Sequence, residues 1–164
     1  MEELPFEKNK LTMSILMTPD KANFSGNVHG GDLLKYLDQV AYACAARYCG
    51  GYVVTISVDQ VMFKHPVSVG TLVTFLASVN FTGRTSMEIG IKVVSEDIQN
   101  GTVIDTNSCF FTMVHVDENG KPKEIEPLQP KSDVEKRRFH DGKMRRHIRL
   151  HGFNSIKSEE FTSE

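Results

Sequence analysis

The chain has no apolar run that approaches the roughly 20 residues of a membrane-spanning helix. Its first residues are acidic and polar, without the apolar core of a signal peptide, so we expect no secretion signal. It has only three cysteines, Cys44, Cys49 and Cys109, and their spacing matches no metal site. Together these absences predict a cytoplasmic protein with free, buried thiols and no membrane partner.

Motifs for metals and nucleotides are also missing. The sequence contains no His-Glu-x-x-His, no Cys-x-x-Cys and no phosphate-binding loop of the Walker type. We therefore expect no metal and no separate cofactor. With 164 residues, 40% hydrophobic and 24% charged, the composition is typical of one globular domain.

Positive charge is concentrated near the C-terminus. Residues 1–130 carry 10 basic against 15 acidic side chains, whereas residues 131–151 carry 8 against 3. Nucleic-acid binding would need interleaved aromatic side chains, and Phe139 is the only one besides the histidines, so we expect no nucleic-acid partner. A solvated helix is the simplest interpretation of this segment, and a basic rim for a phosphorylated ligand is the alternative.

Hydrophobic periodicity predicts one long helix and five strands. The helix is expected over 31–49, between a loop at 20–30 and a terminator at Gly50-Gly51. The strands are expected at 11–17, 53–63, 72–81, 87–93 and 102–116, with a type I′ hairpin at Asn100-Gly101 and further turns at 82–85 and 118–121. Short turns imply antiparallel neighbours, and the long helix is the element available to cover the sheet. The expected fold is therefore α+β, an antiparallel sheet wrapped around a central helix.

The chain divides into a domain at 10–130 and a basic helical extension with a frayed tail at 131–164. The extension has only sparse contacts to offer, from Val134, Arg138 and Met144, so we expect it to pack weakly on the domain. Beyond Gly152, serine and glutamate dominate, and a frayed end is expected.

Asp38 breaks the apolar pattern of the predicted helix. The expected buried face consists of Leu34, Leu37, Ala41, Cys44, Ala45 and Tyr48. At about 100° per residue, Asp38 falls on this face, where an ionised carboxylate needs a partner. A structural ion pair or hydrogen bond would satisfy it, and so would a role as general base or nucleophile.

The loop before the helix strengthens the catalytic interpretation. Gly30 and Gly31 lie at the helix N-terminus, where free backbone N–H groups can stabilise an oxyanion and glycine admits close approach. Asn23, further upstream, could hold an attacking water or satisfy its own loop. An oxyanion site, a carboxylate and an amide within 16 residues are the parts of an acyl-transfer site. His29 is expected to line the pocket, and His65 to belong to a turn.

Several blocks of sequence resemble the hotdog-fold acyl-CoA thioesterases, in particular the bacterial and brain-cytosolic acyl-CoA hydrolases. The first block runs from Asn23 through Gly26, His29, Gly30 and Gly31 to Leu33, Leu34, Leu37 and Asp38. Further similar blocks lie at 54–59, 83–88, 110–112, 119–122 and 133–139. The resemblance covers about residues 10–145 and implies a hotdog fold, hydrolysis of acyl-CoA to a carboxylic acid and coenzyme A, and assembly as a homodimer or a trimer of dimers.

The resemblance also implies roles for individual residues. Asn23 of one subunit and Asp38 of the other would meet at the thioester, whose carbonyl would face the N–H of Gly30 or Gly31. The coenzyme A part would contact the turn residues Gly83, Arg84, Thr85 and Ser86, together with His29, Lys64 and the basic extension. From the residues alone, a hydratase or dehydratase using His29 and a non-catalytic acyl-CoA sensor remain as alternatives.

Overall fold

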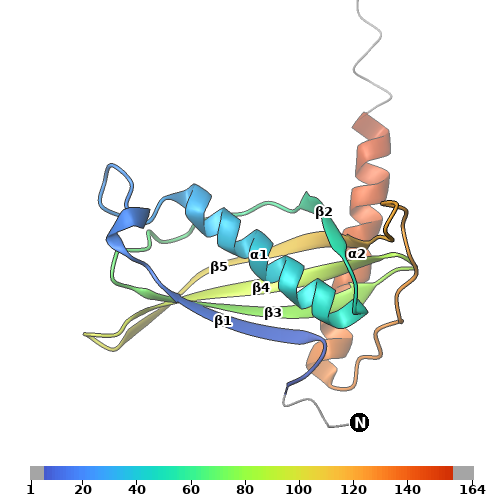
Figure 1. Cartoon of the computed structure of the whole chain (residues 1–164), viewed down its shortest axis with the longest axis horizontal. Helices are drawn as coiled ribbons and strands as arrows, with labels where there is room; N and C mark the ends of the chain where they lie inside the picture. Colours follow the sequence, from blue (N-terminus) through green and yellow to red (C-terminus); the bar gives the residue numbers. More distant parts are fainter. Residues whose placement is uncertain (1–5, 157–164) are drawn as a thin grey trace, which may run out of the picture.

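A computed structural model describes residues 6–156 of the chain, with side chains up to residue 151. Five strands form one antiparallel sheet in the order β1-β3-β4-β5-β2 (Figure 1). Their bounds are β1 Lys10–Leu16, β2 Val53–Val58, β3 Leu72–Thr82, β4 Ser86–Asp97 and β5 Thr102–His115. A short 3-10 helix at Pro19–Lys21 lies in the loop after β1. The predicted strands are all present, and they pair as the short turns require.

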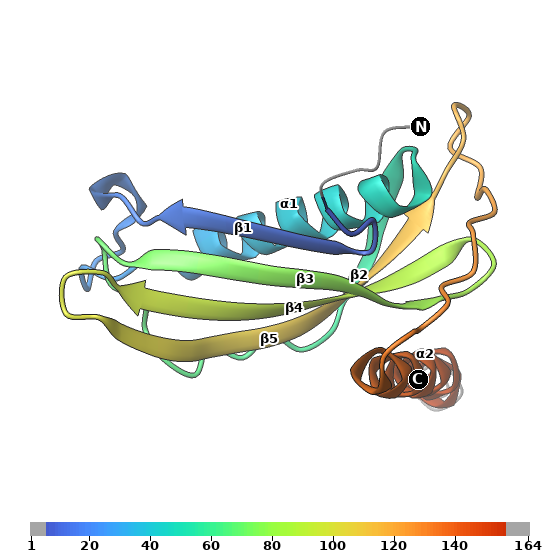
Figure 2. The same cartoon turned by 90° about the horizontal axis from the view of Figure 1, so that it is seen from below.

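Helix α1, Gly30–Cys49, lies across one face of the sheet, and a second helix lies on the other side (Figure 2). The buried side chains of α1 form the core together with Phe75, Ile89, Ile91 and Phe111 of the central strands. Gly50 ends the helix with φ 67°, a conformation that glycine adopts without steric cost. The predicted sheet around a central helix is therefore confirmed.

The buried face of α1 is rotated from the predicted one. Leu33 and Val40 are buried, whereas Leu34 is 41% exposed and Asp38 is exposed. Leu37, Ala41, Cys44, Ala45 and Tyr48 are buried as predicted. Only the placement of Leu34 and Asp38 was wrong, because both faces of this helix carry apolar residues and periodicity alone assigned the side of Leu34 to the core. Asp38 therefore lies on an exposed face that is partly apolar.

The second predicted strand, 53–63, is too long. The strand β2 ends at Val58 after a register shift between Thr55 and Ser57. Beyond it, the chain follows β5 irregularly, with Asp59 N donating to Phe110 O at 2.9 Å and Lys64 N donating to Thr106 O at 3.4 Å. The regular ladder therefore ends before the apolar run at 61–63, in which Met62 and Phe63 are exposed.

The turn at Asn100-Gly101 is not of type I′. Gly101 has φ 67°, but no residue other than glycine has a positive φ in the described chain, whereas type I′ needs two. The side chain of Asp97 accepts hydrogen bonds from the N–H groups of Gln99 and Asn100. This local bonding favours a longer turn over the two-residue one.

Helix α2, Asp133–Ile156, packs firmly on the outer face of the sheet, which contradicts the expected weak contact. Glu88 of β4 is 1% exposed, and its Oε1 forms an ion pair with Nη2 of Arg145 at 2.6 Å. The rings of Phe81 and Phe139 lie 5.1 Å apart, and Gly142 allows the close approach beside them. Val134 and Met144 are exposed, so charge pairing and one aromatic contact hold the helix, which apolar periodicity cannot reveal.

The start of α2 is fixed by a capping box. Glu135 Oε2 accepts from the N–H of Lys131 at 2.8 Å and of Ser132 at 3.1 Å, and Ser132 Oγ accepts from Glu135 N. The frayed tail was expected beyond Gly152, but the helix continues to Ile156. The rest of the expected tail lies outside the described residues. The boundary between domain and extension at 130 stays a prediction.

Candidate active site

Asp38 lies near the middle of α1, beside the edge strand β2. Its Oδ1 accepts a hydrogen bond from Thr55 Oγ1 at 2.7 Å, a normal distance for a hydroxyl donor. Met113 Sδ lies 3.4 Å from the same hydroxyl and is a weaker acceptor. Thr55 therefore orients one carboxylate oxygen, and the other has no hydrogen-bond partner among residues 6–156.

His29 caps the N-terminus of α1. Its Nδ1 accepts a hydrogen bond from the N–H of Gly31 at 3.0 Å, and its carbonyl accepts from Asp32 N at 3.0 Å. Of the two glycine N–H groups at this terminus, only that of Gly30 has no partner within residues 6–156. Because Gly31 is engaged, the geometry favours Gly30 as the donor to an oxyanion, and His29 contributes as a capping residue.

Asn23 lies in the loop before α1 and stabilises that loop. Its Oδ1 accepts from Ser25 N at 2.8 Å and from Asn27 N at 3.1 Å. Its Nδ2 has no hydrogen-bond partner in the described part of the chain. The expectation that Asn23 satisfies its own loop is therefore correct for Oδ1, while its amide N–H groups remain available to a water or a substrate. Asn23 and Asp38 share no hydrogen bond within the described protomer.

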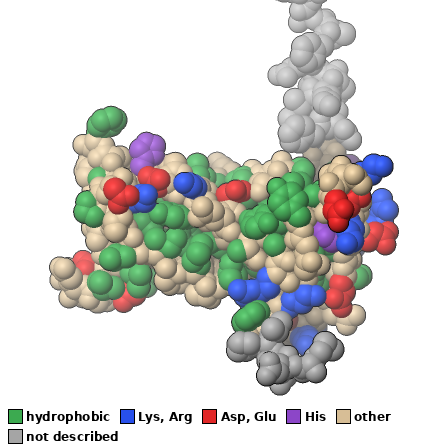
Figure 3. All heavy atoms as spheres, in the orientation of Figure 1, with side chains coloured by type: hydrophobic (Ala, Val, Ile, Leu, Met, Phe, Trp, Pro, Cys, Tyr) green, Lys and Arg blue, Asp and Glu red, His purple; other side chains and the backbone are tan. Residues whose placement is uncertain are grey.

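The edge of β2 next to Asp38 is open and apolar. Within residues 6–156, β2 pairs with β5 alone, so its other edge has unsatisfied backbone groups. Tyr52 and Ile56 are 61% and 62% exposed, and Val58 is also exposed. Hydrophobic side chains gather on this face of the molecule (Figure 3). Exposed strand edges of this kind pair with another strand, so the site borders a surface suited to a second protomer.

The predicted coenzyme A residues do not gather in one protomer. Gly83, Arg84, Thr85 and Ser86 form the turn between β3 and β4, at the opposite end of the 11-residue strand β3 from the loop before α1. At about 3.3 Å per residue, these ends lie on the order of 30 Å apart. Lys64 is exposed near Thr106, far along β5 from this turn. A ligand that contacts both regions would therefore have to use more than one subunit.

The turn itself is polar and partly engaged. Arg84 forms an exposed ion pair with Glu124 at 3.5 Å, and its carbonyl accepts from Ile125 N at 3.0 Å. Gly83 N donates to Ser86 O at 2.7 Å, which closes the turn. Exposed ion pairs of this type are weak, so Arg84 can exchange Glu124 for another anion.

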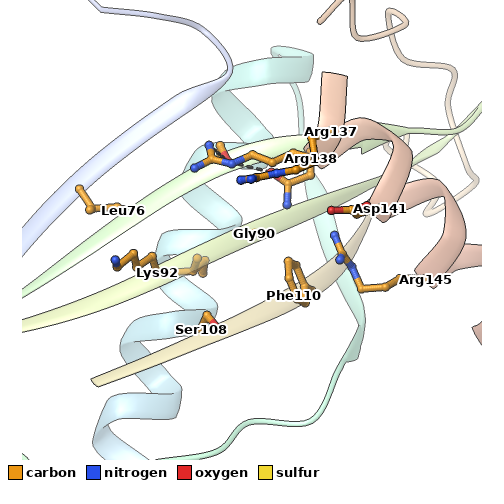
Figure 4. Close-up of a pocket in the computed structure, with 12 residues that line it drawn as sticks. Leu76, Gly90, Lys92, Ser108, Phe110, Arg137, Arg138, Asp141 and Arg145 are labelled. Atoms are coloured by element: carbon orange, nitrogen blue, oxygen red, sulfur yellow. Dashed lines mark hydrogen bonds between the residues drawn. The ribbon is translucent and has the colours of Figure 1, made fainter. Parts of the chain in front are cut away.

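A hollow, which the sequence did not reveal, lies between α2 and the outer face of the sheet (Figure 4). Its volume is about 270 Å³, and Arg137, Arg138 and Arg145 point into it from α2. Arg145 stacks 3.6 Å from the Phe110 ring centre while it pairs with Glu88. The sparse apolar residues of the extension hid this contact, and the sequence carries no signal that Glu88 is buried against a basic helix.

The described residues contain no group of three His, Cys, Asp or Glu side chains that could hold a metal ion. The site instead offers a free backbone N–H, a carboxylate oriented by a hydroxyl, and an unpartnered amide. No described helix is long and apolar enough to cross a membrane.

The comparisons agree with this chemistry. The model of the thioesterase superfamily matches residues 25–102. The protein VdlD of Helicobacter pylori is 52% identical over 147 residues, covering 90% of this chain and 84% of VdlD. A hexameric acyl-CoA thioesterase is 35% identical, with a TM-score of 0.83 over 87% of this chain and 91% of its own.

The fold and the site thus define a hotdog-type thioester hydrolase. The chain belongs to the acyl-CoA thioesterases of this superfamily. The resemblance noted in the sequence is confirmed.

One further structure is informative about the site. An acyl-CoA hydrolase from Staphylococcus aureus, solved with butyryl coenzyme A and coenzyme A, is 27% identical, with a TM-score of 0.79 over 91% of this chain and 93% of its own. It was also studied as alanine variants of an asparagine, an aspartate and a threonine. Successive members of this trio are 15 and 17 residues apart, the same spacings as Asn23, Asp38 and Thr55 here.

Proposed function

We propose that this acyl-CoA thioesterase hydrolyses its substrate with Asp38 as the general base, Gly30 N–H as the oxyanion donor and Asn23 as the group that positions water or substrate. The observation that carries the proposal is the Thr55–Asp38 hydrogen bond at 2.7 Å beside the open edge of β2. The matching spacing of the trio studied in the S. aureus enzyme supports the same residues.

In the proposed reaction, Asp38 removes a proton from water, and the hydroxide attacks the thioester carbonyl. The negative charge that develops on the carbonyl oxygen is stabilised by Gly30 N–H and the helix dipole. The C–S bond then breaks, and the thiolate of coenzyme A receives the proton from Asp38. Because the thiolate is a good leaving group, water, a base and a donor suffice, and we propose that no cofactor is needed.

The geometry also supports a site shared between two subunits. Gly30 and Asp38 lie eight residues apart on α1, about 12 Å along the helix axis, and Asn23 lies further away in the preceding loop. Pairing of two protomers through the open edge of β2 would cover Ile56 and Tyr52 and bring a second copy to Asp38. We propose a homodimer in which Asn23 of one subunit serves Asp38 of the other, and its further assembly as a trimer of dimers.

Activity of the variants Asp38→Ala and Asn23→Ala tests both parts. Each homogeneous variant should lose at least about 100-fold in kcat, the scale of a lost general base for Asp38. Unfolding and refolding the two together should restore about a quarter of the sites, because half the dimers are mixed and each has one intact pair. Near-normal hydrolysis by folded Asp38→Ala would refute the base, and no restoration by mixing would refute the shared site.

Substrate binding and location are proposed on separate grounds. Arg84, Thr85 and Ser86 offer a cation and hydroxyls to the phosphates of coenzyme A from a neighbouring subunit, with Lys64 contributing from another region. The three cysteines are free thiols, and burial raises the pKa of Cys44 and Cys109 to about 12. Unpaired thiols are typical of a reducing compartment, which supports a cytoplasmic location.

A further inference from the structure

Among the described residues, Phe24 has the most exposed large apolar side chain. Its relative exposure is 112%, whereas no other large apolar side chain exceeds 63%. The ring therefore adds nothing to the core of its own protomer. Single exposed apolar residues are common on protein surfaces, so exposure alone assigns no role. Phe24, however, directly follows Asn23, the residue proposed to act on the other subunit.

The loop that carries Phe24 is held in one shape by its own hydrogen bonds. Asn23 N donates to Asn27 O at 2.6 Å, and Asn23 Oδ1 accepts from Asn27 N at 3.1 Å. Gly26 N donates to Asn23 O at 3.0 Å, and its φ of 79° is one that glycine adopts without steric cost. A loop ordered in advance loses little entropy on binding. It presents the ring of Phe24 and the unpartnered Nδ2 of Asn23 side by side, on Cα atoms about 3.8 Å apart.

The exposed face of α1 around Asp38 has a matching pattern. Leu34 and Tyr42 lie four residues before and after Asp38, so the three side chains share one face of the helix. Leu34 is 41% exposed and Tyr42 is 40% exposed. One oxygen of Asp38 has no hydrogen-bond partner among residues 6–156. This face therefore offers an acceptor between two apolar side chains, which complements a donor beside an aromatic ring.

The two halves of this match do not meet within one protomer. The ring of Phe24 is fully exposed, and Asn23 shares no hydrogen bond with Asp38 in the described chain. In the proposed dimer, Asn23 of one subunit reaches Asp38 of the other. The adjacent Phe24 is then brought to the same face of the second copy, where apolar side chains flank the carboxylate.

We propose that Phe24 of one subunit packs on Leu34 and Tyr42 of the other, beside Asp38, and closes the shared site against bulk water. The inference rests on the proposed hydrolase function and its shared site, and it adds Phe24 as a positioning residue. Burial of the ring would hold the amide of Asn23 in register with the carboxylate that it serves. Exclusion of bulk water would strengthen the electrostatic interactions inside the site.

Mixed dimers can place the change at one site or the other. A dimer of one Asn23→Ala chain and one Asp38→Ala chain has a single intact site, which takes Asn23 from the Asp38→Ala chain. Adding Phe24→Ala to the Asp38→Ala chain removes the ring from the intact site. Adding it to the Asn23→Ala chain removes the ring from the site that is already inactive, and this arrangement is the matched control.

Each pair of chains is refolded together and assayed by release of free thiol from saturating butyryl-CoA. Loss of the ring from the intact site should lower activity roughly tenfold below the matched control, the scale of one large apolar contact. The matched control should equal the pair without Phe24→Ala. At the intact site, Phe24→Leu should retain most of the activity, and Ser25→Ala, in the same loop, should leave it unchanged. Both arrangements lack one ring per mixed dimer, so a weaker dimer alone lowers both equally.

Equal activity in the two arrangements, or lower activity in the matched control, would overturn the assignment. A loss with Phe24→Leu as large as that with Phe24→Ala would also overturn it. Phe24→Ala should keep the wild-type circular dichroism spectrum, because the ring is fully exposed in the protomer. If Asn23→Ala and Asp38→Ala regain no activity together, the shared site fails and this assignment fails with it. Absence of thiol release from any acyl-CoA by the wild-type chain would instead refute the proposed function.

Discussion

The hydrogen bond between Thr55 and Asp38 gives a direct measure of how far the carboxylate depends on its orientation. Thr55→Val removes the hydroxyl and keeps the shape and the β-branched backbone preference. A hydrogen bond to a charged group contributes about 1.5–3 kcal/mol. Both side chains are exposed in the protomer, so in the variant a hydrogen bond from water to Asp38 replaces part of this free energy. About 1–2 kcal/mol of transition-state stabilisation should therefore be lost.

At 1.4 kcal/mol for each factor of ten, the expected loss in kcat/KM is roughly 5- to 30-fold. Thr55→Ser retains the hydroxyl and serves as the matched control, which should stay within about twofold of wild type. Release of free thiol from butyryl-CoA measures activity, and thermal unfolding shows whether β2 remains intact. Wild-type activity in Thr55→Val, or an equal loss in the valine and serine variants, would show that orientation by this hydroxyl is unimportant.

Two further predictions concern helix α2. Gly142→Ala gains about 1 kcal/mol of helix propensity, but its Cβ would lie 2.9 Å from Phe81 Cβ and Glu88 Oε1; overpacking of about 1–3 kcal/mol should dominate. Chemical denaturation should show net destabilisation, and a gain in stability would contradict the packing. The N–H groups of Lys131 and Ser132 lower the pKa of Glu135 to about 2 from 4.5. A group whose pKa is lowered by folding stabilises the folded state at pH values above its pKa in the unfolded chain. The free energy of unfolding of the wild-type chain should therefore exceed that of Glu135→Gln by a constant amount above about pH 5, and this difference should shrink as the pH falls toward 2. A constant difference down to pH 2 would contradict the prediction.

The sequence predicted the elements of the sheet because their signals are local. Alternating apolar residues, the glycine at position 50 and short polar turns each act within a few residues, and the structure follows them. Errors arose where a longer-range contact decides. The segment 59–63 is rich in apolar residues, yet only two backbone hydrogen bonds, at Asp59 and Lys64, tie the ends of its path to β5.

Contacts between distant residues were hidden for a physical reason. Glu88 looks like an exposed strand residue until Arg145, 57 residues later, covers it. Asn107 likewise reads as a polar interruption of a strand, because the bulge that turns it inward depends on pairing with β4. The Asp38 partner Thr55 belongs to the same class, since a helix and an edge strand meet only after folding.

Exposure of Asp38 sharpens its proposed role. Active sites commonly exclude bulk water apart from the reacting molecule, yet within one protomer Asp38 faces the open edge of β2. The same edge exposes Ile56 and Tyr52, whose burial by a second copy would release apolar surface from water and drive association. Desolvating Asp38 in the process would be costly unless the partner supplied a donor. The unpartnered Nδ2 of Asn23 is a donor of this kind, so the residue that completes the site would also offset the free-energy cost of burying Asp38.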